Sequence, residues 1–213
     1  MGELLTTPSE TPARKRRSDG ERSRAAILDA ATRLATVEGL DGLSIGRLAE
    51  HTGMSKSGLY AHFGSKEELQ LATIDAASEI FVREVIEPAR ATEGIARVEA
   101  LADAFLSYIE RGVFAGGCFF RAAQAEYDTN PGLVRDKVRE AHGSWLRYLE
   151  QQVRGAQERG EITASEEPAQ LAFEIYAMLE TADSMYQLND DPAALERGRS
   201  GIRALLARAK IGA

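Results

Sequence analysis

The chain has 213 residues and 44 % hydrophobic content, which is enough to bury a core in one or two domains. No apolar run approaches the roughly 20 residues that span a bilayer, and the N-terminus lacks the apolar core of a signal peptide. The single cysteine, Cys118, has no partner for an internal disulfide. These features exclude a fully disordered or membrane-spanning chain and predict a cytoplasmic protein.

The formal charge of −7 is unevenly distributed. Residues 1–66 carry 10 Lys and Arg against 8 Asp and Glu, whereas residues 67–213 carry 16 against 25. The overall acidity argues against a nucleic-acid partner, but the two parts differ in sign. Such an asymmetry indicates one charged-ligand surface, in the N-terminal third.

Residues 1–20 are expected to form a flexible N-terminal arm that contains the basic run Arg14–Arg17. The arm is either a solvated tail or a segment that follows DNA phosphates or enters a minor groove. A first helix is expected from Glu21 until Gly39 stops it. Its apolar face combines Ile27, Ala31 and Leu34.

Two short helices are expected next, at Ser44–His51 and Ser55–Phe63, with a glycine turn at Gly53 between them. A serine that can cap the helix begins each one. This is the helix-turn-helix layout, whose second helix enters the major groove of DNA, although ordinary helical bundles also contain such pairs. The residues expected to face inward are Ile45, Leu48, Leu59 and Phe63.

A fourth helix begins at the pattern Ser65–Glu68, which fits a capping box: the serine hydroxyl accepts a backbone N–H while Glu68 reaches back. It should run towards Glu87, before Pro88. The domain is therefore expected to span residues 21–68, with this helix continuing to about residue 87.

Residues 90–213 show further helical periodicity and no sustained alternation typical of strands, so the fold class is all-α. Turn signals separate the segments. The expected helices contain residues 98–109, 119–127, 134–158, 168–182 and 195–209.

The segment from Ile45 to Leu69 carries a long ungapped pattern, Ile-x-x-Leu-Ala followed by Gly-Met-Ser-Lys-x-Gly-Leu-Tyr-x-His-Phe-x-Ser-Lys-Glu-Glu-Leu. Together with Ile27-Leu-x-Ala-Ala-x-x-Leu34 and Gly39, it resembles the DNA-binding domain of the TetR family of bacterial transcriptional regulators. The resemblance covers about residues 21–70. It implies an all-helical homodimer with an N-terminal helix-turn-helix DNA-binding domain, and a C-terminal helical domain for ligand binding and dimerisation.

The resemblance also implies which residues contact double-stranded operator DNA. Recognition-helix positions, phosphate-contacting positions and positions near the start of the second helix fall in turn on Ser55, Lys56, Ser57 and Gly58, on Tyr60, His62 and Lys66, and on Ser44 and Arg47. Two departures concern this pattern: Ala61 replaces a common aromatic or polar residue, and Arg47-Leu-Ala49 replaces Asp-Ile-Ala. The operator sequence is therefore not transferable.

The C-terminal domain, residues 90–213, resembles the family through Gly116–Phe120 and the spacing to Trp145. A mostly apolar cavity there would suit a small hydrophobic or aromatic effector, although each aromatic residue could instead fill the core. The candidate pocket residues are Phe105, Tyr108, Phe114, Phe119, Phe120, Tyr127, Trp145, Tyr148, Phe173, Tyr176 and Tyr186.

The last two amphipathic helices are candidates for a four-helix dimer interface, or else they complete the protomer core. The candidate interface residues are Leu171, Ile175, Met178, Leu195, Ile202 and Leu205. Cys118 is read as packing rather than as a thiol sensor, and His142 as a surface residue.

The expected function is a ligand-responsive regulator, most simply a repressor that releases its operator when an effector binds. The alternatives are a helical enzyme or a protein-binding adaptor. No phosphate-binding loop, zinc-protease motif, cysteine pair or nucleophile motif is present, so no catalytic residue, cofactor or metal is expected. The sequence does not identify the effector, the operator, the regulated genes or the sign of regulation.

Overall fold

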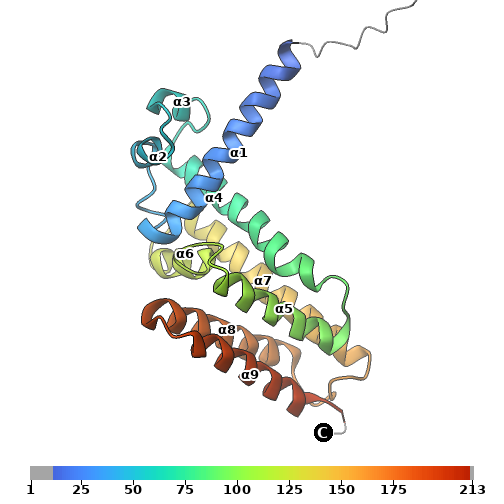
Figure 1. Cartoon of the computed structure of the whole chain (residues 1–213). Coiled ribbons are helices and arrows are strands. Elements are labelled where there is room, and N and C mark those ends of the chain that lie inside the picture. Colours follow the sequence, from blue (N-terminus) through green and yellow to red (C-terminus); the bar gives the residue numbers. More distant parts are fainter. Residues whose placement is uncertain (1–11, 212–213) are drawn as a thin grey trace, which may run out of the picture.

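The protein is helical throughout residues 12–211, which a computed structural model describes, with side chains from Asp19 onward (Figure 1). Within this range the only β-type pairing is an isolated bridge between Ile162 and Lys210, so the all-α prediction is confirmed. The α-helices are α1 (Pro12–Glu38), α2 (Ile45–Thr52), α3 (Lys56–Tyr60), α4 (Lys66–Phe81), α5 (Gly94–Glu110), α6 (Phe119–Tyr127), α7 (Leu133–Glu158), α8 (Pro168–Asn189) and α9 (Pro192–Ala209).

Helix α1 begins earlier than the sequence predicts. It starts at Pro12 rather than Glu21, so residues 12–20 are helical and the expectation of a flexible arm is wrong for them. Proline suits the first turn of a helix, and the Arg, Lys and Ala residues that follow are good helix formers. Residues 1–11 and the side chains of Arg14–Arg17 lie outside the described part.

The fourth helix changes its pitch before Pro88. The α-helical part ends at Phe81 and continues as a π-helical segment, η1 (Val82–Ile86), and a 3₁₀ turn, η2 (Glu87–Ala89). The predicted continuation to about residue 87 is therefore helical but not α-helical. Such π-helical turns are rare and often lie at functional sites.

The helices form two connected parts (Figure 1). Helices α2 and α3 pack beside α1, and α4 contacts α1 on one side and α7 on the other. Helices α8 and α9 lie side by side at the opposite end of the molecule from α3, and they pack against α5 and α7. Helix α4 therefore belongs to both parts and connects them.

The loop before α6 fits closely against both parts through two glycines. A Cβ atom at Gly116 would overlap the carbonyl oxygen of Thr36 in α1. Gly117 has a φ of +81°, and a Cβ there would overlap a carboxylate oxygen of Asp183 in α8. Glycine is required at these positions because the loop passes so near its neighbours.

Candidate nucleic-acid interface and effector cavity

The helix-turn-helix forms through the local signals that the sequence contains. The Ser44 hydroxyl accepts a hydrogen bond from the Arg47 N–H at 3.3 Å, and the Ser55 hydroxyl accepts one from the Gly58 N–H at 3.1 Å. Between them Gly53 takes a left-handed conformation with a φ of +69°. The predicted caps and turn are confirmed, although α3 is shorter than expected and ends at Tyr60.

The capping box at the start of α4 closes with a shifted partner. The Ser65 hydroxyl accepts from the Glu68 N–H at 3.0 Å, as predicted. The Glu68 carboxylate accepts from the N–H of Gly64 at 2.9 Å, one residue before the cap. The turn between α3 and α4 is thereby fixed from both sides.

Burial separates the inner and outer faces of this unit. The side chains predicted to face inward are buried: Ile45, Leu48, Leu59 and Phe63. The Arg24 guanidinium lies 5.0 Å from the centroid of the Phe63 ring and covers that ring from α1. The inner face therefore holds α3 in place against α1 and α2.

The outer face of α3 is polar. Ser55, Lys56, Ser57 and Tyr60 are exposed, Tyr60 by 58 %, while Gly58 and His62 are half-buried. Among residues 19–211, Lys56 makes no ion pair. This face can donate hydrogen bonds and positive charge to a groove or a phosphate.

Two predicted phosphate contacts are held by acidic neighbours in the free protein. The Arg47 guanidinium pairs with Glu38 at 2.5 Å and 3.0 Å, and the Lys66 ammonium pairs with Asp41 at 2.9 Å. Arg47 lowers the pKa of the Glu38 carboxyl, and Lys66 lowers that of Asp41. These cations attach α2 and α4 to α1 and to the turn that follows it.

Helix α6 connects that same turn to the C-terminal part. The Glu126 carboxylate accepts the backbone N–H groups of Leu40 and Asp41, both at 2.7 Å. From α4, the Gln70 side-chain amide donates to the Leu40 carbonyl and to the Tyr127 hydroxyl, both at 2.9 Å. A displacement of α6 must therefore act on the segment that positions α2.

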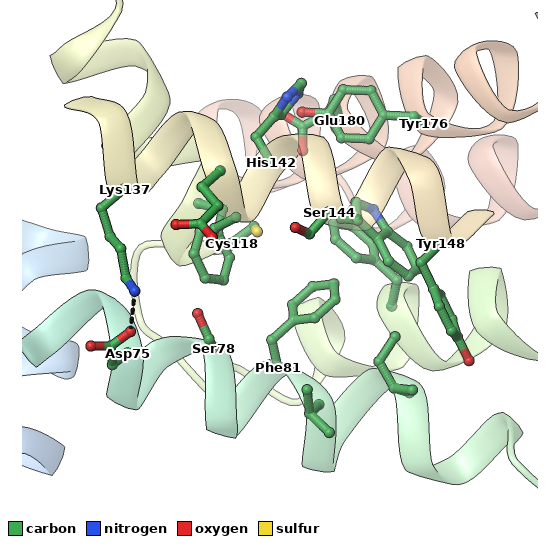
Figure 2. A pocket seen from close by; sticks show the side chains of 17 residues that line it. Asp75, Ser78, Phe81, Cys118, Lys137, His142, Ser144, Tyr148, Tyr176 and Glu180 are labelled. Carbon is green, nitrogen blue, oxygen red and sulfur yellow. Dashed lines mark ion pairs between the residues drawn. The ribbon is translucent and has the colours of Figure 1, made fainter. Parts of the chain in front are cut away.

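A cavity of about 460 Å³ lies between α4, η1, α7 and α8 (Figure 2). Its walls are mainly apolar, and α5 and the start of α6 contribute as well. It is lined by Asp75, Ser78, Phe81, Val82, Ile86, Phe105, Cys118, Phe120, Lys137, Glu140, Ala141, His142, Ser144, Trp145, Tyr148, Tyr176 and Glu180. Its size and character suit a small organic ligand.

The aromatic residues predicted for the pocket divide into two groups. Those that line the cavity are Phe105, Phe120, Trp145, Tyr148 and Tyr176. The others do not: Tyr108, Phe114, Phe119 and Tyr127 are buried in the core, Tyr186 packs partly buried against it, and Phe173 is 57 % exposed. The periodicity located the helices but not the direction of each ring towards the cavity or the core.

Several lining residues were missed by the sequence analysis. Ser78, Phe81 and Val82 come from a helix that was assigned to a connection between domains, and Ile86 from its π-helical end. His142 lines the cavity and is half-buried rather than a surface residue, and burial lowers its pKa. Only the unusual pitch before Pro88 could have indicated a functional segment there, and sequence does not show pitch.

Titratable groups of the cavity differ in their environment. The Lys137 ammonium pairs with Asp75 at 2.8 Å, and burial raises the pKa of Glu180 to about 7 (Figure 2). Burial also raises the pKa of Cys118 to about 12, so its thiol stays protonated at neutral pH, which favours packing over thiol chemistry. Within the described residues no group of three or more His, Cys, Asp or Glu is arranged to hold a metal.

The residues predicted for a dimer interface lie mostly inside the protomer. Five of the six are at most 3 % exposed and Met178 is half-buried, so that prediction is wrong for these five: Leu171, Ile175, Leu195, Ile202 and Leu205. The sequence analysis chose the most apolar stripe of each helix, and that stripe packs against α5 and α7.

The exposed face of α8 is apolar instead. Phe173, Met185 and Leu188 are 57 %, 40 % and 81 % exposed. At about 100° per residue they fall within about 120° of the helix circumference. A soluble protomer gains nothing by exposing such a face, which indicates a contact surface.

A helix-turn-helix with a polar recognition face, connected through α6 to a helical part with an apolar cavity, defines a two-domain DNA-binding protein. Two family models match the chain: one described as bacterial regulatory proteins, tetR family, over residues 27–73, and one described as tetracyclin repressor-like, C-terminal domain, over residues 94–202. The chain therefore belongs to the TetR family and is a DNA-binding transcriptional regulator.

Individual relatives agree with this assignment. The HTH-type transcriptional regulator LmrA of Bacillus subtilis strain 168 is 28 % identical over 141 residues, which are 62 % of this chain and 71 % of that protein. AcrR of Shigella flexneri is 35 % identical over 57 residues, which are 27 % of this chain and 26 % of that protein. A TetR regulator from Chloroflexus aurantiacus superposes with a TM-score of 0.84 at 27 % identity, covering 91 % of this chain and 98 % of that one.

Proposed function

We propose that this regulator is a repressor that leaves its operator when a small molecule occupies the cavity beside α6. The observation that carries the proposal is the position of α6 between two sites. Phe120, in its first turn, lines the cavity, and Glu126, in its last turn, accepts the N–H groups of Leu40 and Asp41. No helix of the described range is long and apolar enough to cross a membrane, and we infer a cytoplasmic location, where operator DNA lies.

In this proposal the effector acts by favouring one arrangement of α6. A ligand that displaces Phe120 moves the helix, and Glu126 transmits the movement to the turn between α1 and α2. The effect is limited by the difference in ligand affinity between the two arrangements. The rigid contacts of Gly116 and Gly117 at the start of α6 leave little slack, so a small displacement is passed on.

For DNA contact we propose the exposed face of α3 as the recognition surface, with Lys56 and Tyr60 as its main side chains. Ser55, Ser57 and His62 add hydrogen-bond donors, and Gly58 permits close approach. Arg47 and Lys66 contact phosphates only if they exchange their pairs with Glu38 and Asp41 for the DNA. Lys56, whose charge is already free among the described residues, contributes more to affinity in this arrangement.

A homodimer is proposed through the exposed face of α8. Phe173, Met185 and Leu188 replace the interface residues that the sequence suggested. Two recognition helices then have to reach major grooves about 34–36 Å apart. Leu188→Glu should dissociate the dimer in sedimentation velocity, whereas the equally exposed-type change Leu133→Glu on α7 should not. A Leu188→Glu protein that stays dimeric refutes this interface.

The proposal is tested by titrating the protein against DNA from its own promoter region and against an unrelated fragment, each at two salt concentrations. Specific binding with a steep salt dependence is expected, because several phosphates are neutralised. Equal affinity for both fragments at every salt concentration contradicts it. A screen for compounds that change the fluorescence of Trp145, a cavity residue and the single tryptophan, then finds effectors, which should also release the promoter fragment.

A further inference from the structure

The side chains that line the cavity carry an excess of negative charge. Three carboxyl groups, Asp75, Glu140 and Glu180, face one basic side chain, Lys137. Lys137 is already paired with Asp75 at 2.8 Å, and burial lowers the pKa of His142, which keeps its ring neutral. Glu140 and Glu180 are therefore without a compensating cation among the lining residues.

Glu180 is the carboxyl group that is removed from water. It lies on α8 with Tyr176 and His142 beside it, away from the Lys137–Asp75 pair (Figure 2). Burial and then the charge of Asp183 raise its pKa, while Arg121 and a hydrogen bond from Tyr176 oppose the rise. The group therefore retains a desolvation cost that a neighbouring cation would relieve.

Arg121 is not that cation, because it is committed elsewhere. Its Nε donates to Asp183 Oδ2 at 2.6 Å, and its Nη2 donates to the Gly116 carbonyl at 3.1 Å. The same Asp183 oxygen accepts the Cys118 N–H at 3.1 Å. Among the described residues, no basic side chain forms an ion pair with Glu180.

Aromatic rings supply the remaining walls. The Phe81 ring meets Phe120 and Trp145 edge-to-face, with centroids 5.9 Å and 5.1 Å apart, and Trp145 stacks on Tyr148 at 6.2 Å. The faces of such rings attract positive charge, and the attraction strengthens where water is excluded. Aromatic walls with a buried carboxylate suit a cation that has an apolar body.

We propose that the cavity selects an organic cation with an aromatic or apolar body, whose positive group is held against Glu180. The inference rests on the proposed function in one respect, namely that this cavity is the effector site. A neutral ligand leaves Glu180 without a counter-charge, and an anion meets Glu140 and Glu180 while the single lysine is already paired. A cation is the one charge class that gains from both the carboxylates and the rings.

The test uses three probes with one skeleton and different charge: 4-phenylbutylamine, 4-phenylbutanol and 4-phenylbutyrate. Each is titrated into the full-length protein at pH 8, where the amine is protonated and Glu180 is ionised, and Trp145 fluorescence reports occupancy. We expect the amine to bind at least about tenfold more tightly than the carboxylate, with the alcohol in between. Equal or tighter binding of the alcohol or the carboxylate overturns the proposal, and so does the absence of binding by all three.

A variant pair assigns the preference to one side chain. Glu180→Gln keeps the shape and removes the charge, so the affinity for the amine should fall about tenfold or more while that for the alcohol changes less than about twofold. Glu174→Gln, on the same helix but outside the cavity, should change neither. Unchanged amine binding in Glu180→Gln overturns the assignment.

Promoter DNA separates this inference from the proposed function. If the amine binds with the expected preference but does not release the DNA, the cation preference stands and the effector response fails. If the carboxylate binds more tightly and releases the DNA, the effector response stands and the cation preference fails.

Discussion

The two ends of this molecule build their sites in different ways. The DNA-facing surface comes from one continuous segment, Ser44 to Lys66, in which each cap and turn is made by residues at most four positions apart. The cavity draws its walls from helices as distant in sequence as α4 and α8. A site made by neighbours in sequence forms with its own segment, whereas a cavity exists only when separate helices have packed.

Their charges are also arranged in opposite ways. In the N-terminal part the cations Arg47 and Lys66 are paired with carboxylates, and phosphates would have to displace those partners. In the cavity it is a carboxylate, Glu180, that lacks a basic partner among the described residues. One end is therefore prepared for a polyanion and the other for a cation.

The largest effect is expected from removing the ring that holds the helix-turn-helix together. Phe63→Ala deletes a fully buried side chain and should lower the free energy of unfolding of this part by about 3–5 kcal/mol. DNA binding should be lost while probe binding at Trp145 survives, because the cavity uses no residue of α1–α3. Differential scanning calorimetry and the two binding assays measure this. Simultaneous loss of both sites would show that the two parts do not fold separately.

The next effect concerns the pH dependence of stability. The folded protein retains the Glu180 proton up to about pH 7, whereas the unfolded chain releases it near 4.5, so the folded state binds more protons between these values. The free energy of unfolding should therefore fall as pH rises through this window, by about 2–3 kcal/mol from this group.

Urea unfolding of wild type and Glu180→Gln at pH 5 to 8 measures that contribution. The two should converge near pH 5, and the variant should be the more stable protein at pH 8. Glu174→Gln should follow the wild type, and parallel curves for wild type and Glu180→Gln would remove Glu180 as the cause.

A smaller effect is expected from the connection between the two ends. Glu126→Gln weakens two hydrogen bonds to backbone N–H groups and should cost about 1–2 kcal/mol of stability. More informatively, it should reduce the change in DNA affinity that an effector produces. The control is Asp128→Asn, an exposed carboxyl two residues later. A variant with undiminished effector response shows that coupling follows another route.

The smallest effect compares a free cation with a paired one. Lys56→Ala should weaken DNA binding about five- to tenfold and lower the salt slope by about one. Arg47→Ala should cost less affinity, because its charge is already offset by Glu38. Fluorescence anisotropy at several salt concentrations measures both, and a larger loss for Arg47 would reverse the ranking.

Much of the fold was predictable because its signals are local. Ser44, Ser55 and Ser65 cap their helices as expected, and Gly39 and Gly53 take the left-handed conformations that end helices. The start of α1 was placed too late because an Arg-rich, uncapped sequence resembles a flexible tail. The π-helical turn at Val82 has no sequence signal.

The sites were predictable to different degrees. The exposed residues of α3 follow from the inward pair Leu59 and Phe63, because a helix with one fixed face has a known opposite face. That inference failed on α8, where the strongest apolar stripe turned inward and the weaker face, with Phe173 and Leu188, was left exposed. A helix with two apolar faces does not specify which of them its neighbours will cover.

The sequence alone determined the all-helical class, the helix-turn-helix and its family, since these depend on spacing and caps within short segments. Tertiary packing decided which aromatic rings line the cavity, that Glu180 lies there without a basic partner, and that Arg47 and Lys66 are paired. These properties depend on the distance between residues far apart in the chain, which only the packed helices set.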